Sequence, residues 1–96
     1  MKIQDLRDGM KRIDVEGTII EKTEPREVQS RTSDKTFKVA NAILSDDTGN
    51  IKLTLWNKQI NQVNVNDKIK IENGYVTSFR GEIQLNIGRY GSMSVE

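Results

Sequence analysis

Flat aromatic side chains and positive charges lie close together in two short segments of the sequence. One segment ends in Trp56, the only tryptophan of the chain, and the other contains Tyr75, Phe79 and Arg80. Aromatic rings can stack on unpaired bases, and each stacked base contributes about 1–3 kcal/mol to binding. Cations beside the rings can neutralise phosphates. These residues therefore indicate noncovalent recognition of a single-stranded nucleic acid.

The residue types that are missing argue against catalysis. The chain has 96 residues with no His and no Cys. This removes disulfides, thiolate nucleophiles, the most common general base and most zinc sites. Asp46 and Asp47 are followed by Thr48 and Gly49, a pattern typical of a structural turn. We therefore expect no enzymatic activity, no cofactor and no bound metal.

The overall charge gives little support for a polyanionic ligand. The chain carries 15 Lys and Arg residues and 14 Asp and Glu residues, a formal net charge of +1. Residues 26–58 contain six cations and four acids, whereas acids exceed cations by one in residues 1–25. Because this asymmetry is small, electrostatic attraction should be modest and the aromatic rings should supply much of the affinity.

Alternation of polar and apolar residues predicts an all-β protein. Runs with a period of two residues predict five strands, at about residues 13–23, 37–45, 51–56, 68–79 and 83–87. In the third run the apolar side chains share one face, and the opposite face presents Lys52, Thr54 and Trp56. Residues 46–50 and 80–81 have the composition of tight hairpin turns.

The fourth predicted strand requires one extra residue. Ile69 and Ile71 have the same parity as Tyr75 and Phe79, so an unbroken strand would place all four side chains on one face. A bulge at Asn73-Gly74 would move the two aromatic rings to the face opposite the isoleucines.

Three segments lack this alternation. Residues 25–36 are polar and predict a long loop, and residues 57–66 predict a short helix or linker. Near the N-terminus, Ile3, Leu6 and Met10 predict a small element that covers one end of the core.

The order of these elements is that of the OB fold, a five-stranded Greek-key barrel with a short helix or linker between strands 3 and 4. Residues 1–96 are expected to form one such domain. OB folds bind ligands on the face of their second and third strands and in the flanking loops. The residues expected there are Trp56, Tyr75 and Phe79 for base stacking, Lys52, Arg31, Lys35 and Arg80 for phosphate contacts, and the outward-facing Thr54.

Two longer motifs carry a family resemblance. Residues 46–56 fit the pattern D-x-T-G-x-I-x-L-x-L-W, and residues 75–86 fit aromatic-x3-F-[KR]-G-x-x-Q-L-N. Together they resemble archaeal single-stranded DNA-binding proteins, which are relatives of the OB domains of replication protein A. The resemblance implies stacking of bases on Trp56, Tyr75 and Phe79, a role in replication, repair or recombination, and other replication proteins or further OB domains as partners. Tyr75 stands where close relatives often have Trp, which implies weaker stacking at this position.

Two other functions are compatible with the same residues. The chain could bind single-stranded RNA or tRNA, because stacking tolerates either sugar. It could also be a protein-interaction OB domain within a larger replication complex, because a fold does not determine a function. No apolar run approaches the ~20 residues of a membrane span, and the polar N-terminus does not resemble a signal peptide. A cytoplasmic protein is therefore expected.

Overall fold

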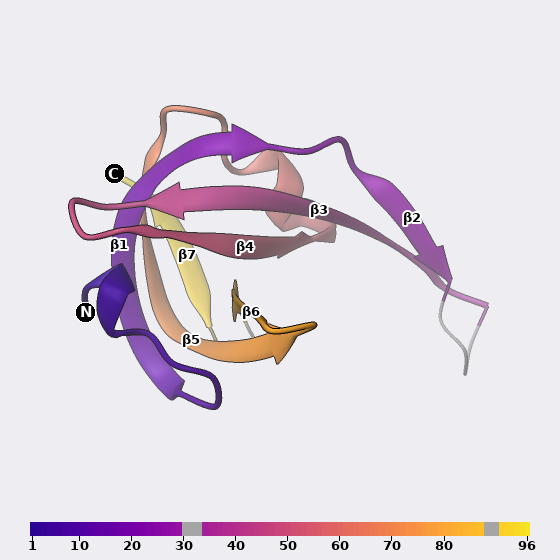
Figure 1. The fold of residues 1–96 in the computed structure, drawn as a ribbon. Coiled ribbons are helices and arrows are strands. Elements are labelled where there is room, and N and C mark those ends of the chain that lie inside the picture. The colour runs from indigo at the N-terminus through magenta and orange to yellow at the C-terminus, as the bar shows by residue number, and fades with distance from the viewer. Residues whose placement is uncertain (30–33, 88–90) are drawn as a thin grey trace.

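The alternating segments form β-strands that curve around a common core (Figure 1). The computed structural model describes residues 1–29, 34–87 and 91–96. Within these ranges the helical elements are two short 3-10 helices, and none is long and apolar enough to cross a membrane. The elements are η1 (Ile3–Asp5), β1 (Lys11–Lys22), β2 (Arg26–Gln29), β3 (Thr36–Ser45), β4 (Asn50–Trp56), η2 (Asn57–Asn61), β5 (Lys68–Phe79), β6 (Glu82–Asn86) and β7 (Ser92–Val95).

The sheet closes because β1 pairs with two different strands. Its C-terminal half pairs with β3 and its N-terminal half with β5, both antiparallel. The order around the barrel is β1-β3-β4-β6-β5, and β4 and β6 are parallel neighbours. The five predicted strands correspond to β1, β3, β4, β5 and β6, so the predicted all-β OB fold is confirmed.

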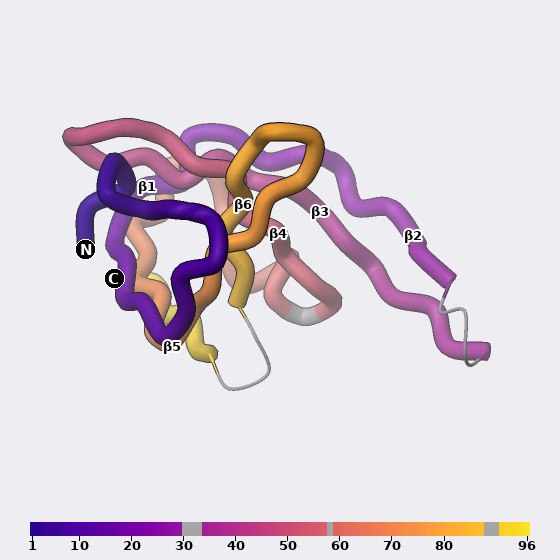
Figure 2. Tube along the Cα trace, turned by 60° about the horizontal axis from the view of Figure 1, so that its bottom comes forward, coloured from indigo at the N-terminus to yellow at the C-terminus, as the bar shows by residue number. Residues whose placement is uncertain are grey.

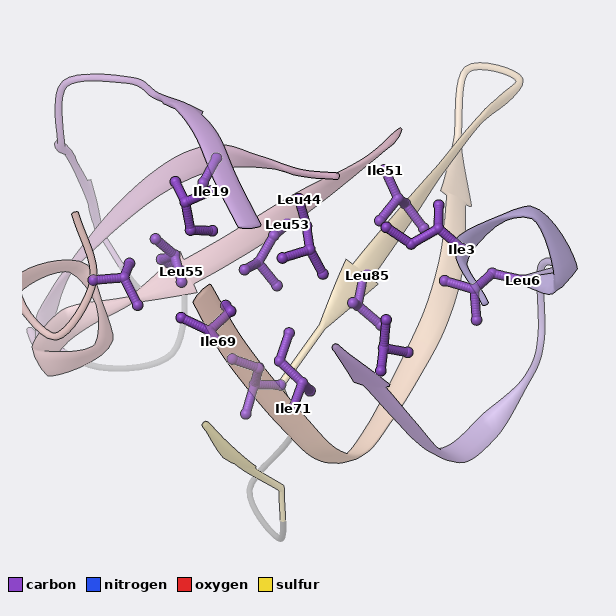
Figure 3. Packing of buried hydrophobic residues seen from close by; sticks show 14 of the residues in the cluster. Ile3, Leu6, Ile19, Leu44, Ile51, Leu53, Leu55, Ile69, Ile71 and Leu85 are labelled. Carbon is purple, nitrogen blue, oxygen red and sulfur yellow. The ribbon is translucent and has the colours of Figure 1, made fainter. Parts of the chain in front are cut away.

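The inward-facing side chains form one apolar core (Figure 3). Leu53 and Leu85 are partners across β4 and β6, and both are fully buried. Burying a side chain of this size stabilises the fold by about 1.5–3 kcal/mol. Ile3 and Leu6 form one end of this cluster (Figure 3), which confirms the predicted N-terminal cover.

The predicted bulge in β5 is also confirmed. Between the pairs Ile13↔Gly74 and Val15↔Ile71, β5 has one more residue than β1. Asn73 has a φ of 58°, in the left-handed region that Asn tolerates better than most residues. Buried positions are odd before the bulge and even after it. Tyr75 is therefore turned away from the core.

The prediction of a continuous loop at residues 25–36 is wrong. Residues 26–29 form β2, which pairs antiparallel with residues 36–39 of β3. We call these two paired segments the arm; it extends away from the barrel in both Figure 1 and Figure 2. All four residues of β2 are exposed, so no core imposes an apolar alternation on them, and the sequence contained no strand signal.

Two short elements remain, and the first agrees with the short helix or linker predicted at residues 57–66. Residues 57–66 contain the 3-10 helix η2, which begins where the Gln59 side chain accepts a hydrogen bond from the Trp56 N–H (3.0 Å). The Lys22 ammonium donates to the carbonyls of Ile60 and Val63, which ties this segment to β1. Strand β7 pairs with the start of β5 and was not predicted, because four residues contain too little alternation to recognise.

The turn between β3 and β4 is held by one carboxylate. Asp46 accepts hydrogen bonds from the N–H groups of Ile3 (2.9 Å), Thr48 (2.7 Å) and Gly49 (3.1 Å), and from the Thr48 hydroxyl. Burial disfavours the charged carboxylate, but the hydrogen bonds outweigh it and lower the pKa of Asp46 to about 2. The predicted structural role of this turn is confirmed, and Asp46 also fastens η1 to it.

Replacing Asp46 with asparagine should make stability less sensitive to acid. Because the pKa of Asp46 is lower in the folded chain than its usual 3.8, the carboxylate stabilises the fold above about pH 4 and loses this effect as the pH falls toward 2. Asp46→Asn should therefore lower the free energy of unfolding by about 1 kcal/mol at pH 7 and by less at pH 2. The figure is small because solvent screens this partly exposed carboxylate. Urea unfolding at both pH values measures the difference. Asp47→Asn is the matched control, since among the described residues the Asp47 carboxylate hydrogen-bonds only to the exposed Lys2. A loss of stability for Asp46→Asn that is equal at both pH values would contradict the assignment.

Candidate nucleic-acid interface

The outer surfaces of β4, β6 and β5 form one continuous face. On β4, Trp56 points away from the core while Leu55 points into it. Strand β6 lies between β4 and β5, and the register pairs Thr54 with Asn86 and Asn86 with Tyr75. Since residues that are direct partners share a face, these strands place Trp56 and Tyr75 on the same side of the barrel.

Three aromatic rings stand on this face. Trp56 is 40% exposed, Tyr75 37% and Phe79 61%. Strand spacing places Tyr75 about 10 Å from Thr54, and Trp56 lies two residues further along β4, about 7 Å. Phe79 lies four residues along β5 from Tyr75, about 13 Å. The rings are separate platforms and do not form one cluster.

Hydrogen-bonded polar residues fill the space between the rings. The Asn86 side-chain amide donates to the Thr77 hydroxyl (3.0 Å), and the Thr54 hydroxyl donates to Oε1 of the Gln84 side chain (3.4 Å). Thr54 was predicted to face outward, but it is only 7% exposed because the side chains of β6 cover it. These hydrogen bonds link the side chains of β4, β6 and β5, while Thr54 itself offers little surface to a ligand.

Two of the predicted cations lie on the same face as the rings. The Lys52 ammonium is on the same face as Trp56 and approaches the Glu82 carboxylate at 3.6 Å. The Arg80 guanidinium lies 5.2 Å from the centroid of the Phe79 ring, within the range of a cation–π contact. Arg80 and Gly81 have φ values of 53° and 80°, as the two-residue type I′ hairpin turn requires. This turn presents Phe79 and Arg80 together at the tip of β5.

The other two predicted cations lie in the sequence between the end of β2 and the start of β3. Lys35 is described and exposed, next to the start of β3. Arg31 lies outside the described residues. The face itself extends onto the arm, because Val39 is the partner of both Trp56 and Arg26. The sequence offers Arg26, like Arg31 and Lys35, as a phosphate contact from the polar segment 25–36, but its position on this face depends on strand β2, which was not predicted.

The surface has hollows of different sizes, and a large one is not at the face that carries the aromatic rings. One of about 200 Å³ lies at its β1 side, between Glu21, Ile43 and Lys52. A larger hollow of about 590 Å³, lined among others by Lys2 and Lys70, contains none of the aromatic rings. Among the described residues no group of three or more acidic side chains is arranged to hold a metal ion.

Comparisons with a family model and with individual proteins point to the same family. The family model described as "Single-stranded DNA binding protein Ssb-like, OB fold" matches residues 10–95. The chain is 36% identical over 87 residues to the single-stranded DNA-binding protein Ssb of Saccharolobus solfataricus, and 30% identical over 89 residues to replication factor A of Methanothermobacter thermautotrophicus. These matches cover 91% and 92% of this chain, but only 57% and 11% of the two relatives.

A solved structure has the same fold over the whole chain. The OB domain of a Thermoplasma acidophilum protein superimposes with a TM-score of 0.84 at 25% sequence identity. The match covers 100% of this chain and 85% of that domain. The two structures therefore share the OB fold.

Proposed function

Because this chain belongs to the family of Ssb-like single-stranded DNA-binding proteins with an OB fold, we propose that it binds single-stranded DNA with little preference for sequence. The chain is a binding domain and not an enzyme. The observation that carries the proposal is the placement of three exposed aromatic rings on one face by the β4-β6-β5 register.

Base stacking would supply most of the affinity. Trp56, Tyr75 and Phe79 each present a ring to solvent, and an unpaired base can cover that ring whatever its identity. The distances between the rings mean that each ring receives its own base. Duplex DNA keeps its bases stacked on one another and cannot offer these faces, so the proposal includes discrimination against duplex.

Phosphate contacts would supply a smaller, salt-dependent contribution. Lys52 and Arg80 lie on the same face as the rings, and Arg31 and Lys35 are the other two residues predicted to contact phosphates. Each phosphate that is neutralised on a single strand contributes about −0.7 to the slope of log affinity against log salt. With few cations on the face, the slope should be shallow.

Binding to a labelled oligo-dT tests this proposal. Fluorescence anisotropy at a series of salt concentrations should show binding that weakens moderately as salt rises, with a slope of about −3 or smaller in magnitude if all four cations contribute. Duplex of the same length should compete poorly. No binding to the oligonucleotide at low salt would refute the proposal.

The same experiment separates the other candidate functions. An oligo-U of equal length, measured at one salt concentration, tests a preference for RNA. A protein-interaction domain would bind neither oligonucleotide. A role in replication, repair or recombination, cooperation with further OB domains or other replication proteins, and a cytoplasmic location are parts of this proposal.

A further inference from the structure

A small polar-walled hollow lies on the same face as the aromatic rings, on the side of β1. Ile43 forms part of its apolar floor, with Glu21 on one side and Lys52 on the other. The register pairs Glu21 with Ile43 and Ile43 with Lys52, so the three residues stand in one row across β1, β3 and β4. We call this hollow of about 200 Å³ the β1 slot.

A bulge in β1 creates the wall formed by Glu21. The pairs Ile19↔Leu44 and Glu21↔Ile43 leave Ile20 as one extra residue on β1. In a regular strand without the bulge, Glu21 would be two residues after the fully buried Ile19 and would point the same way, into the core. Bulges often re-aim a side chain next to a functional site, and this one turns a carboxylate onto the proposed DNA-binding face.

The carboxylate of Glu21 is available to a ligand. Glu21 is exposed, and among residues 1–29, 34–87 and 91–96 it takes part in no hydrogen bond or ion pair. A carboxylate on a surface that binds polyanions would repel phosphates, so it does not help backbone binding. It can instead accept hydrogen bonds from the N–H groups on the edge of a base.

The end of the slot is rigid and polar. The Thr23 N–H donates to the Asn41 carbonyl (2.8 Å), and the Asn41 N–H donates to the Thr23 hydroxyl (2.9 Å). The Asn41 backbone is therefore fixed at the slot, and its side-chain amide has no hydrogen-bond partner within the part of the chain that the structure describes.

We propose that the β1 slot holds one guanine of the bound strand, between the carboxylate of Glu21 and the ammonium of Lys52. The inference rests on the proposed function, and it adds one base-selective position to an otherwise base-tolerant surface. A carboxylate only accepts hydrogen bonds and an ammonium only donates them. Guanine matches both walls, because its N1–H and amino group donate on one edge while its O6 and N7 accept on the other.

The dimensions of the slot agree with this occupant. Glu21 and Lys52 lie two strands apart, about 10 Å between their Cα atoms, which leaves room for one flat ring system between the two side chains. The volume of about 200 Å³ is below the roughly 300–1,000 Å³ of pockets for larger ligands. The Lys52 ammonium approaches the Glu82 carboxylate at 3.6 Å on the β6 side. Exposed ion pairs of this kind are weak, so the ammonium, which has three donors, can turn toward a base in the slot.

A single guanine placed in an oligo-dT host tests the proposal. Anisotropy should show that an oligo-dT with one central dG binds about fivefold more tightly than oligo-dT alone, since a hydrogen bond to a charged group is worth more than a neutral one. Replacing that dG by deoxyinosine, which lacks the amino group, should remove most of the gain. A central dC or dA should bind about as oligo-dT does.

The variant Glu21→Gln should abolish the preference for dG while still binding oligo-dT. Glu24→Gln is the matched control, because Glu24 is an exposed acid three residues away that does not line the slot; its preference for dG should persist. Equal affinity for dG-containing and plain oligo-dT, or a preference for dG that survives in Glu21→Gln, would overturn the slot and leave the proposed function intact. A failure to bind any oligonucleotide would instead overturn the proposed function and the slot with it.

Discussion

Trp56→Ala should weaken binding to single-stranded DNA by about 1–3 kcal/mol, or roughly 5- to 150-fold, because one stacked base loses its platform. Labelled oligo-dT followed by anisotropy measures the change, since the variant has no tryptophan of its own to report binding. Tyr75 and Phe79 stay in place on β5, so residual binding is expected.

Two controls separate stacking from a loss of folding. Trp56→Phe keeps a smaller ring and should recover part of the affinity. Trp56 is exposed and lies outside the main core cluster, so thermal unfolding should show that Trp56→Ala stays folded at the temperature of the binding assay. Unchanged affinity of a folded Trp56→Ala would contradict the role given to this ring.

Gly17→Ala should destabilise the barrel by about 1–3 kcal/mol, a large share of the 5–15 kcal/mol that typically holds a domain together. Gly17 lies in β1 between β3 and β5. A Cβ at this position would stand 2.8 Å from the Ser45 carbonyl oxygen and 2.9 Å from Cγ of Leu44. Because Leu44 is fully buried, neither neighbour can move without disturbing the closure of the sheet.

Gly49→Ala is the matched control for this prediction. The nearest atom to a Cβ there is Cγ2 of Ile3, at an ordinary contact distance of 3.9 Å. Urea unfolding should therefore show a clear loss for Gly17→Ala and a small change for Gly49→Ala. Equal stabilities of the two variants would show that β1 is not held as close to β3 as described.

The sequence predicts the barrel well where a core imposes alternation. Leu53 and Trp56 have opposite parity, and this alone places the ring outside. Ile71 and Tyr75 both have odd numbers, yet one faces the core and the other faces solvent. The bulge at Asn73-Gly74, which can be recognised from its composition, explains this change of face. In each case the signal is local, within a few residues of the side chain concerned.

The features that were not predicted depend on distant residues or on strands without a core. Strand β2 is exposed on both faces, so its sequence has no period. The cover over Thr54 comes from β6, some 30 residues away, through a parallel pairing that no local pattern encodes. The bulge that turns Glu21 outward lies at Ile20, the second of two isoleucines that look like ordinary strand residues.

The fluorescence of Trp56 tests the central claim most directly, because it is the only tryptophan and stands on the proposed binding face. Adding unlabelled oligo-dT at low salt should quench its emission in a saturable way, and added salt should reverse part of the quenching as phosphate contacts are lost. Duplex DNA of equal length should have little effect. Emission that stays constant while the oligonucleotide binds would place the DNA elsewhere on the barrel and contradict stacking on Trp56.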